Sequence, residues 1–173
     1  MAKTVSIKKL TTTAMLSAFA LITFMIENLF PPLFLPGAKL GLSNIFILVA
    51  VLFLGSGYGY AVLIVKAVLG SVFSGNVSSL LYSLPAGLIA LTVEVILLRF
   101  DKVFGLVSVS VFGAIINLVA QNGVFCLVTG VPEYLAYSPY LSLIGILSGA
   151  VIGVTVYLIY NKLPKSVVEK ITN

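Results

Sequence analysis

The sequence predicts an all-α membrane protein with six transmembrane helices and both termini in the cytoplasm. Of its 173 residues, 60% are hydrophobic and only 9% are charged, whereas soluble domains carry about 25% charged residues. Long apolar runs fill the chain, and at roughly 20 residues a span it has room for about six spans and no separate soluble domain. With six spans, eight of the ten basic residues fall on one side of the membrane, as the positive-inside rule requires.

The apolar runs, taken in order, place the spans of a single membrane domain, residues 1–173, at residues 10–30, 41–54, 58–73, 79–98, 103–130 and 139–160. The second and third spans are separated only by Gly55-Ser56-Gly57-Tyr58-Gly59. This run could form a tight turn between two short helices or a kink in one long helix. Charge placement favours the turn, because five spans would put the basic carboxy-terminal tail outside.

The basic residues precede the first span, lie between the fourth and fifth, and follow the last. They are Lys3, Lys8, Lys9, Arg99, Lys102, Lys162, Lys165 and Lys170. The opposite face then carries the 31–44 run and the loops at 74–79 and 131–138. The net charge of +5 is therefore a feature of topology, and we expect no nucleic-acid partner.

The sequence lacks the residues that several kinds of site require. The chain has no histidine, one cysteine and one aspartate, Asp101. These counts exclude His-ligated metals, cysteine clusters, an internal disulfide and the paired aspartates that hold magnesium diphosphates. A phosphate-binding GxxxxGK[ST] loop is also missing. We therefore expect binding or transport, with no catalytic residue, no metal site and no cofactor.

The run Pro31–Asn44, PPLFLPGAKLGLSN, collects proline, glycine, lysine and asparagine between two apolar spans. Its three prolines cannot continue a helix, and Gly37 and Gly41 permit turns and close approach. The run is therefore predicted to be structured, non-helical and external, where it would cap or line a site. Lys39 is its clear charge.

Ionisable residues at membrane depth are costly, so each is a candidate for function. Lys66 lies near the middle of the third span, where it could bind a ligand carboxylate or phosphate, or pair with Glu27 or Glu94. Glu27 closes the first span beside Asn28, as a site residue or as an interfacial carboxylate. Glu94 lies about one turn from the basic cytoplasmic edge, where pairing or snorkelling is expected.

The fifth span contains Asn117 and Gln121, which are four residues apart and share one helix face. Amides there must meet another helix or a ligand, because hydrocarbon cannot satisfy them. Polar residues of the outer loops are expected at the same level, which predicts an outward-opening cavity roofed by residues 31–44. The candidate substrate-binding residues are Glu27, Asn28, Lys39, Asn44, Lys66, Asn76, Tyr82, Asn117, Gln121 and Asn122.

Small residues form two stripes. Ala14 and Ala18, joined by Ser17, make a small-xxx-small pair in the first span. The sixth span carries a GxxxGxxxG stripe at Gly145, Gly149 and Gly153. Such stripes let helices approach closely. We expect the glycine stripe to pack inside the protein, whereas the first-span face is a candidate docking surface for a partner helix.

The run Pro36–Asn44, preceded by Glu27 and Pro31, resembles the PGxKLGLxN signature of the Gx transporter family, which is also labelled heptaprenyl diphosphate synthase component I. The resemblance continues through Ser74-Gly75-Asn76 and Leu81-Tyr82-Ser83-Leu84 to Asn117 and Gln121, and so covers nearly the whole chain.

Two departures from the family pattern stand out. Ile116 and Ala120 stand where the family has His and Gly, and Lys66 stands where it often has Arg. Because lysine cannot form the planar bidentate fork of arginine, the resemblance implies the fold rather than the identity of the substrate.

That family is similar in size, helix number and first-helix AxxxA pattern to the S components of energy-coupling factor transporters. The resemblance implies an S-component-like bundle in a prokaryotic plasma membrane that captures a vitamin-like solute from outside, with residues 31–44 as a gate. It also implies docking through the first helix to a coupling protein and two ATPases, which would hydrolyse the ATP. Lys39 and Lys66 suggest an anionic solute, and Tyr82 one that bears a ring. The alternative is a non-catalytic accessory subunit of isoprenoid or quinone synthesis.

Overall fold

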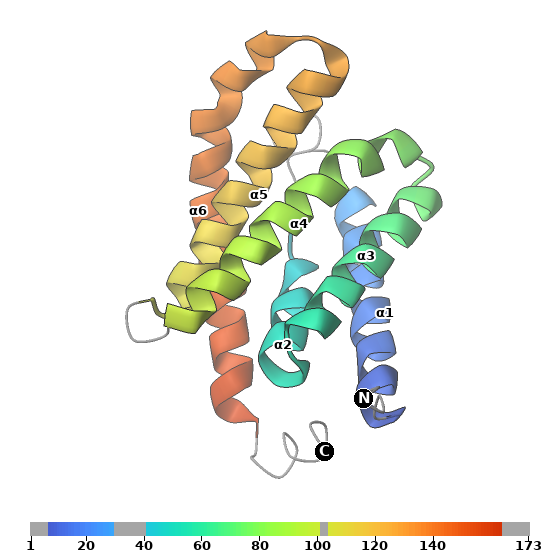
Figure 1. Cartoon of the computed structure of the whole chain (residues 1–173), viewed down its shortest axis with the longest axis vertical. Helices are drawn as coiled ribbons and strands as arrows, with labels where there is room; N and C mark the ends of the chain where they lie inside the picture. Colours follow the sequence, from blue (N-terminus) through green and yellow to red (C-terminus); the bar gives the residue numbers. More distant parts are fainter. Residues whose placement is uncertain (1–6, 30–40, 101–103, 164–173) are drawn as a thin grey trace, which may run out of the picture.

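Six α-helices account for most of the chain, which confirms the predicted all-α fold. The computed structural model describes residues 7–29, 41–100 and 104–163, and no strand occurs among them. Short 3-10 helices η1 (Val77–Ser79), η2 (Leu98–Phe100) and η3 (Pro132–Tyr137) extend the ends of α4 and α6. The α-helices are α1 (Ile7–Leu29), α2 (Asn44–Leu54), α3 (Ser56–Phe73), α4 (Leu80–Leu97), α5 (Leu106–Thr129) and α6 (Ser138–Lys162), as Figure 1 shows.

Five of these helices are long and apolar enough to cross a membrane, which supports a membrane protein. The exception is α2, whose 11 residues span about 16 Å, roughly half of the hydrocarbon thickness. If its carboxy-terminal end reaches the inner surface, its amino-terminal end lies at membrane depth. Each helix overlaps one of the six expected spans.

The break between α2 and α3 is the predicted tight turn. It is made at Gly55, whose φ of 107° is disfavoured for residues with a side chain. The Gly55 N–H donates to the carbonyls of Ala50 and Val51 at 3.1 and 3.2 Å. Gly59, one turn into α3, packs directly against Val51 of α2. The two helices therefore form a close antiparallel hairpin.

The helices pack in two groups of three (Figure 1). Helices α1, α2 and α3 contact one another, and α5 packs along both α4 and α6. Contacts of α2 with α6 and of α3 with α4 join the groups. Helix α1 begins and α6 ends at the same, lower end of the molecule in Figure 1, as an even number of crossings requires.

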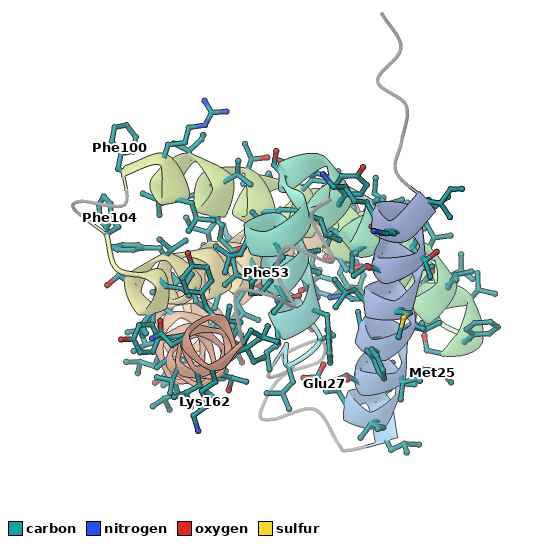
Figure 2. All side chains as sticks on the ribbon, turned by 90° about the horizontal axis from the view of Figure 1, so that it is seen from below. Met25, Glu27, Phe53, Phe100, Phe104 and Lys162 are labelled. Carbon is teal, nitrogen blue, oxygen red and sulfur yellow. The ribbon has the colours of Figure 1, made fainter. Side chains whose placement is uncertain are left out.

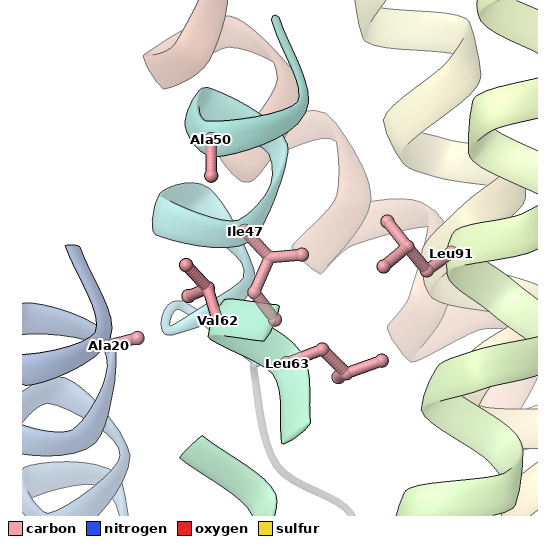
Figure 3. Packing of buried hydrophobic residues seen from close by; sticks show 6 residues of the cluster. All are labelled: Ala20, Ile47, Ala50, Val62, Leu63 and Leu91. Carbon is pink, nitrogen blue, oxygen red and sulfur yellow. The ribbon is translucent and has the colours of Figure 1, made fainter. Parts of the chain in front are cut away.

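Helix α2 takes part in two hydrophobic clusters. One joins it to α1, α3 and α4 through Ala20, Ile47, Ala50, Val62, Leu63 and Leu91, as Figure 3 shows. The other joins Leu48 of α2 to Ile152 and Val156 of α6. Packing on two sides fixes the position of the short helix, and therefore the position of its first residue, Asn44.

The glycine stripe of α6 packs against α5, which confirms the expected internal contact. A Cβ atom built on Gly149 would lie 2.6 Å from the Cα of Val111 and 2.8 Å from the carbonyl oxygen of Ser110. Gly145 and Gly153 approach backbone atoms of Ile115 and Val107 almost as closely. These obstacles are backbone atoms and cannot move aside, so the close α5–α6 contact depends on glycine.

Candidate functional site

Lys66 lies about two turns before the carboxy-terminal end of α3 and reaches to the start of α2. Its Nζ donates to Ser43 Oγ at 3.0 Å and to Asn44 Oδ1 at 2.9 Å. Asn44 is the first residue of α2, where the helix dipole carries a partial positive charge; its N–H and that of Ile45 donate to the carbonyls of Gly41 and Leu42 at 2.8 and 3.1 Å. An ammonium and a helix amino terminus therefore gather positive potential at one point.

Glu27 of α1 binds the same short segment. Its Oε1 accepts a hydrogen bond from the Leu42 N–H at 2.8 Å. Its Oε2 is buried and has no hydrogen-bond partner among the described residues. Figure 2 shows Glu27 on the side of α1 that faces α2, whereas Met25 points away. Residues 42–44 thus hold a carboxylate at one end and an ammonium at the other.

An aromatic ring closes the arrangement. The Lys66 Nζ lies 5.7 Å from the ring centroid of Phe24, at a distance suited to a cation–π contact. The same ring fills the space beside Gly70, where a Cβ atom would lie 2.7 Å from it. Gly70 therefore lets α1 approach α3 closely enough to complete the site. We call this group the Lys66 cluster: Phe24, Glu27, Leu42, Ser43, Asn44 and Lys66.

The Lys66 cluster unites three of the residues singled out in the sequence: Glu27, Asn44 and Lys66. Asn28, next to Glu27 in α1, is half-buried. Lys39 and most of the expected gate lie outside the described residues.

The roles of Ser43 and Phe24 were missed. Ser43 is 1% exposed and belongs to the glycine-rich run, and Phe24 lies one turn before Glu27 on α1. The sequence carried a signal for each residue: the position of Ser43 in the 31–44 run, and the spacing of Phe24 and Glu27.

Glu94 of α4 packs against Gly113 of α5. Because the glycine has no side chain, there is room at this point for the Glu94 carboxylate. Glu94 also lies within electrostatic range of Lys66. Pairing of Lys66 with Glu27 or Glu94, which the sequence allowed, stays a prediction.

Asn117 and Gln121 continue the row on α5 that begins at Gly113, because the three residues are spaced four apart. Both amides are half-buried, and neither hydrogen-bonds another described residue. Helix α5 packs against α4 and α6, whereas α1, α2 and α3 build the Lys66 cluster. No hydrogen bond among the described residues joins this amide pair to the Lys66 cluster.

Two other expected site residues lie near the amino-terminal end of α4 and the carboxy-terminal end of α5. Asn122 Nδ2 donates to the Tyr134 carbonyl at 2.8 Å and to Ser138 Oγ at 3.2 Å. Tyr82 meets Phe125 edge to face, with 5.5 Å between centroids, and Phe125 meets Tyr134 in the same way. Together these contacts fix η3 to α5.

Asn76 is exposed and caps η1, where its Oδ1 accepts a hydrogen bond from the Ser79 N–H at 3.2 Å. It makes a local turn contact just after the carboxy-terminal end of α3. The structure therefore does not bring Asn76, Tyr82 or Asn122 to the Lys66 cluster.

The candidate docking face on α1 divides into two parts. Ser17 is buried and donates to the Thr13 carbonyl at 2.8 Å. Ala14 and Ala18 are exposed, so this small-residue pair is not used in packing within the described part of the chain. It offers a flat strip that a second helix could approach.

The described residues contain no group of three or more His, Cys, Asp and Glu side chains that could hold a metal ion. Cys126 is buried. What the Lys66 cluster offers is non-covalent: an ammonium, a helix amino terminus, a carboxylate and an aromatic ring, which can bind charged and ring-bearing groups.

Comparison with known families gives one result. The family model described as heptaprenyl diphosphate synthase component I matches residues 16–159. This range runs from α1 to α6 and includes the whole Lys66 cluster. Neither the curated proteins nor the solved structures that were compared match the chain.

Proposed function

This chain belongs to the heptaprenyl diphosphate synthase component I family, and for a member with this structure we propose a role as the substrate-binding membrane subunit of an uptake transporter of the energy-coupling factor type. It would capture a vitamin-like or related small molecule from outside a prokaryotic cell. The solute would be anionic or ring-bearing, and residues 31–44, including Lys39, would gate the site.

The observation that carries this proposal is the position of Lys66. Its ammonium stands on α3, which is long and apolar enough to cross a membrane, and is hydrogen-bonded to Ser43 and Asn44 at the start of a half-length helix. A cation there is costly and is rarely kept without a function. In membrane transporters, interrupted helices direct their amino termini toward anionic groups of the substrate. The Lys66 cluster is suited to the same task.

Two further features support a binding role. The ring of Phe24 lies beside Lys66, where it could stack on a ring of the solute. The half-buried amides of Asn117 and Gln121 lack partners among the described residues, although such groups are expected to be satisfied inside a membrane protein. A bound polar solute would satisfy them.

The exposed Ala14–Ala18 strip supports the proposed partnership. A coupling protein could approach α1 closely along it, because small side chains drive helix association in membranes. Two partner ATPases would hydrolyse the ATP. The chain itself would be non-catalytic and would need no cofactor.

The description of the family favours a second candidate, a non-catalytic accessory subunit of prenyl diphosphate or quinone synthesis. Catalysis of prenyl transfer needs clustered carboxylates to hold magnesium diphosphates. The sequence has a single aspartate. Such a subunit would therefore only assist a separate catalytic chain.

One experiment separates the two candidates. The tagged protein is extracted from native membranes in mild detergent, its protein partners are identified, and solute uptake is measured in cells lacking the partner ATPases. The transport proposal predicts a coupling protein, two ATPases and a tightly held small molecule, with uptake lost in the ATPase-deficient cells. A prenyl synthase subunit as the only partner, with no ATPase-dependent uptake, would reject it.

A further inference from the structure

The Lys66 cluster contains charges of both signs, and both charged side chains bind one short segment, residues 42–44. Leu42 donates its backbone N–H to Glu27, and the next two residues accept from Lys66. Because Leu42, Ser43 and Asn44 are consecutive, a small molecule lying along this segment would meet both charges.

The two ends of the cluster differ in how their hydrogen bonds are used. Glu27 Oε1 has the Leu42 N–H as its donor, but Oε2 is buried without a partner among the described residues. A buried carboxylate oxygen that lacks a donor is costly. An arriving cationic N–H group would relieve this cost.

A purely anionic solute fits the cluster poorly. Its charge would be attracted to Lys66 and to the start of α2, but it would also be repelled by the Glu27 carboxylate. A purely cationic solute has the opposite problem at Lys66. Only a molecule with both charges gains at both ends.

We propose that the Lys66 cluster selects a dipolar solute, whose acidic group lies at Lys66 and Asn44 and whose ammonium, amidinium or protonated ring nitrogen binds Glu27 Oε2. This inference rests on the proposed transport function and narrows its substrate class. The ring of Phe24, one turn before Glu27 on α1 and 5.7 Å from the Lys66 Nζ, would cover the body of the solute.

The test uses the full-length protein in detergent after exhaustive dialysis. A polar metabolite extract is split by ion exchange into three pools: acids, bases and amphoteric compounds. Each pool is titrated against the wild type, Glu27→Gln and Glu133→Gln, and the midpoint of thermal unfolding is recorded. Glu133 is the matched control, because it is an exposed carboxylate on η3.

The dipolar proposal predicts that the amphoteric pool raises the midpoint of the wild type and of Glu133→Gln, and that the acid pool does not. Glu27→Gln should need at least about a tenfold higher pool concentration for the same rise, since one charge-assisted hydrogen bond is lost. Gln can still accept from the Leu42 N–H, so the fold is expected to be kept.

A rise with the acid pool alone, undiminished in Glu27→Gln, would overturn the dipolar proposal but leave the transport proposal standing. No rise with any pool would count against both. If Glu27→Gln fails to fold, the choice among pools made by the wild type still decides the question.

Discussion

Lys66 and Glu27 are charged residues whose neighbours along the sequence are mostly apolar. Neither is left to hydrocarbon: Lys66 is bound by Ser43 and Asn44, and Glu27 is bound by the Leu42 N–H. The polar segment 42–44 thus solvates both charges in place of water. At this scale the site is a set of hydrogen bonds that a solute could join.

Asn122 illustrates a polar residue whose bonds are internal. Replacing it with Ala should lower the free energy of unfolding by about 1–3 kcal/mol, because the Tyr134 carbonyl and Ser138 hydroxyl lose their donor. Solute capture should be unchanged. Chemical denaturation in detergent measures the first quantity, with Asn161→Ala, an exposed asparagine of α6, as the control. Lost capture at full stability would instead assign Asn122 to the site.

The sequence was informative about which residues matter and less so about how they meet. Glu27 and Lys66 stand out because ionisable side chains are rare in apolar runs. Their common binding to residues 42–44 could not be predicted, since it depends on the depth at which α2 begins and on how closely Gly70 lets α1 approach. Both are properties of packing between distant segments.

Among the elements, α6 depends most directly on glycine. Gly149→Ala should lower the free energy of unfolding by about 1–3 kcal/mol, because its Cβ would meet backbone atoms of Val111 and Ser110. Gly123→Ala is the control, because a Cβ there meets nothing within 4 Å. It should be neutral or slightly stabilising, as alanine favours a helix. Equal effects of the two substitutions would show that the glycine stripe is not needed for packing.

Helix α1 has an inner face, which packs on α2 and α3, and an exposed face. Replacing Ala14 and Ala18 together with Leu should prevent assembly with a coupling protein and leave solute binding intact, because only the exposed face changes. Co-purification and binding are measured on the same preparations. The Ala14→Ser, Ala18→Ser variant keeps small side chains and should still assemble. Unchanged assembly of the Leu variant would make this face an ordinary lipid contact.

The glycine stripe and the Gly55 turn were predictable because each depends on local spacing. The length of α2 was less clear, because residues 41–44 belong both to the expected span 41–54 and to the expected non-helical run 31–44, and the helix begins only at Asn44. The residue at which α2 begins decides the depth of the Lys66 cluster in the membrane.

At the scale of the whole molecule, six helices bring both described ends to one side (Figure 1). The prediction that both ends lie on the cytoplasmic side is tested with single cysteines at Glu133 and Lys162 in a Cys126→Ala background. A membrane-impermeant maleimide applied to intact cells should label Glu133→Cys and should label Lys162→Cys only after lysis. The reverse pattern would invert the topology and place the basic residues outside, against the positive-inside rule.

The central claim is that the molecule binds a small solute at the Lys66 cluster, and native mass spectrometry of the detergent-solubilised protein tests it most directly. The wild type and the control Lys162→Met, altered at the exposed end of α6, should carry one additional small mass. Lys66→Met should carry at least about tenfold less of it while remaining folded, because the charge-assisted bonds to the solute are lost. Equal occupancy in folded Lys66→Met, or no bound mass in the wild type, would contradict the claim.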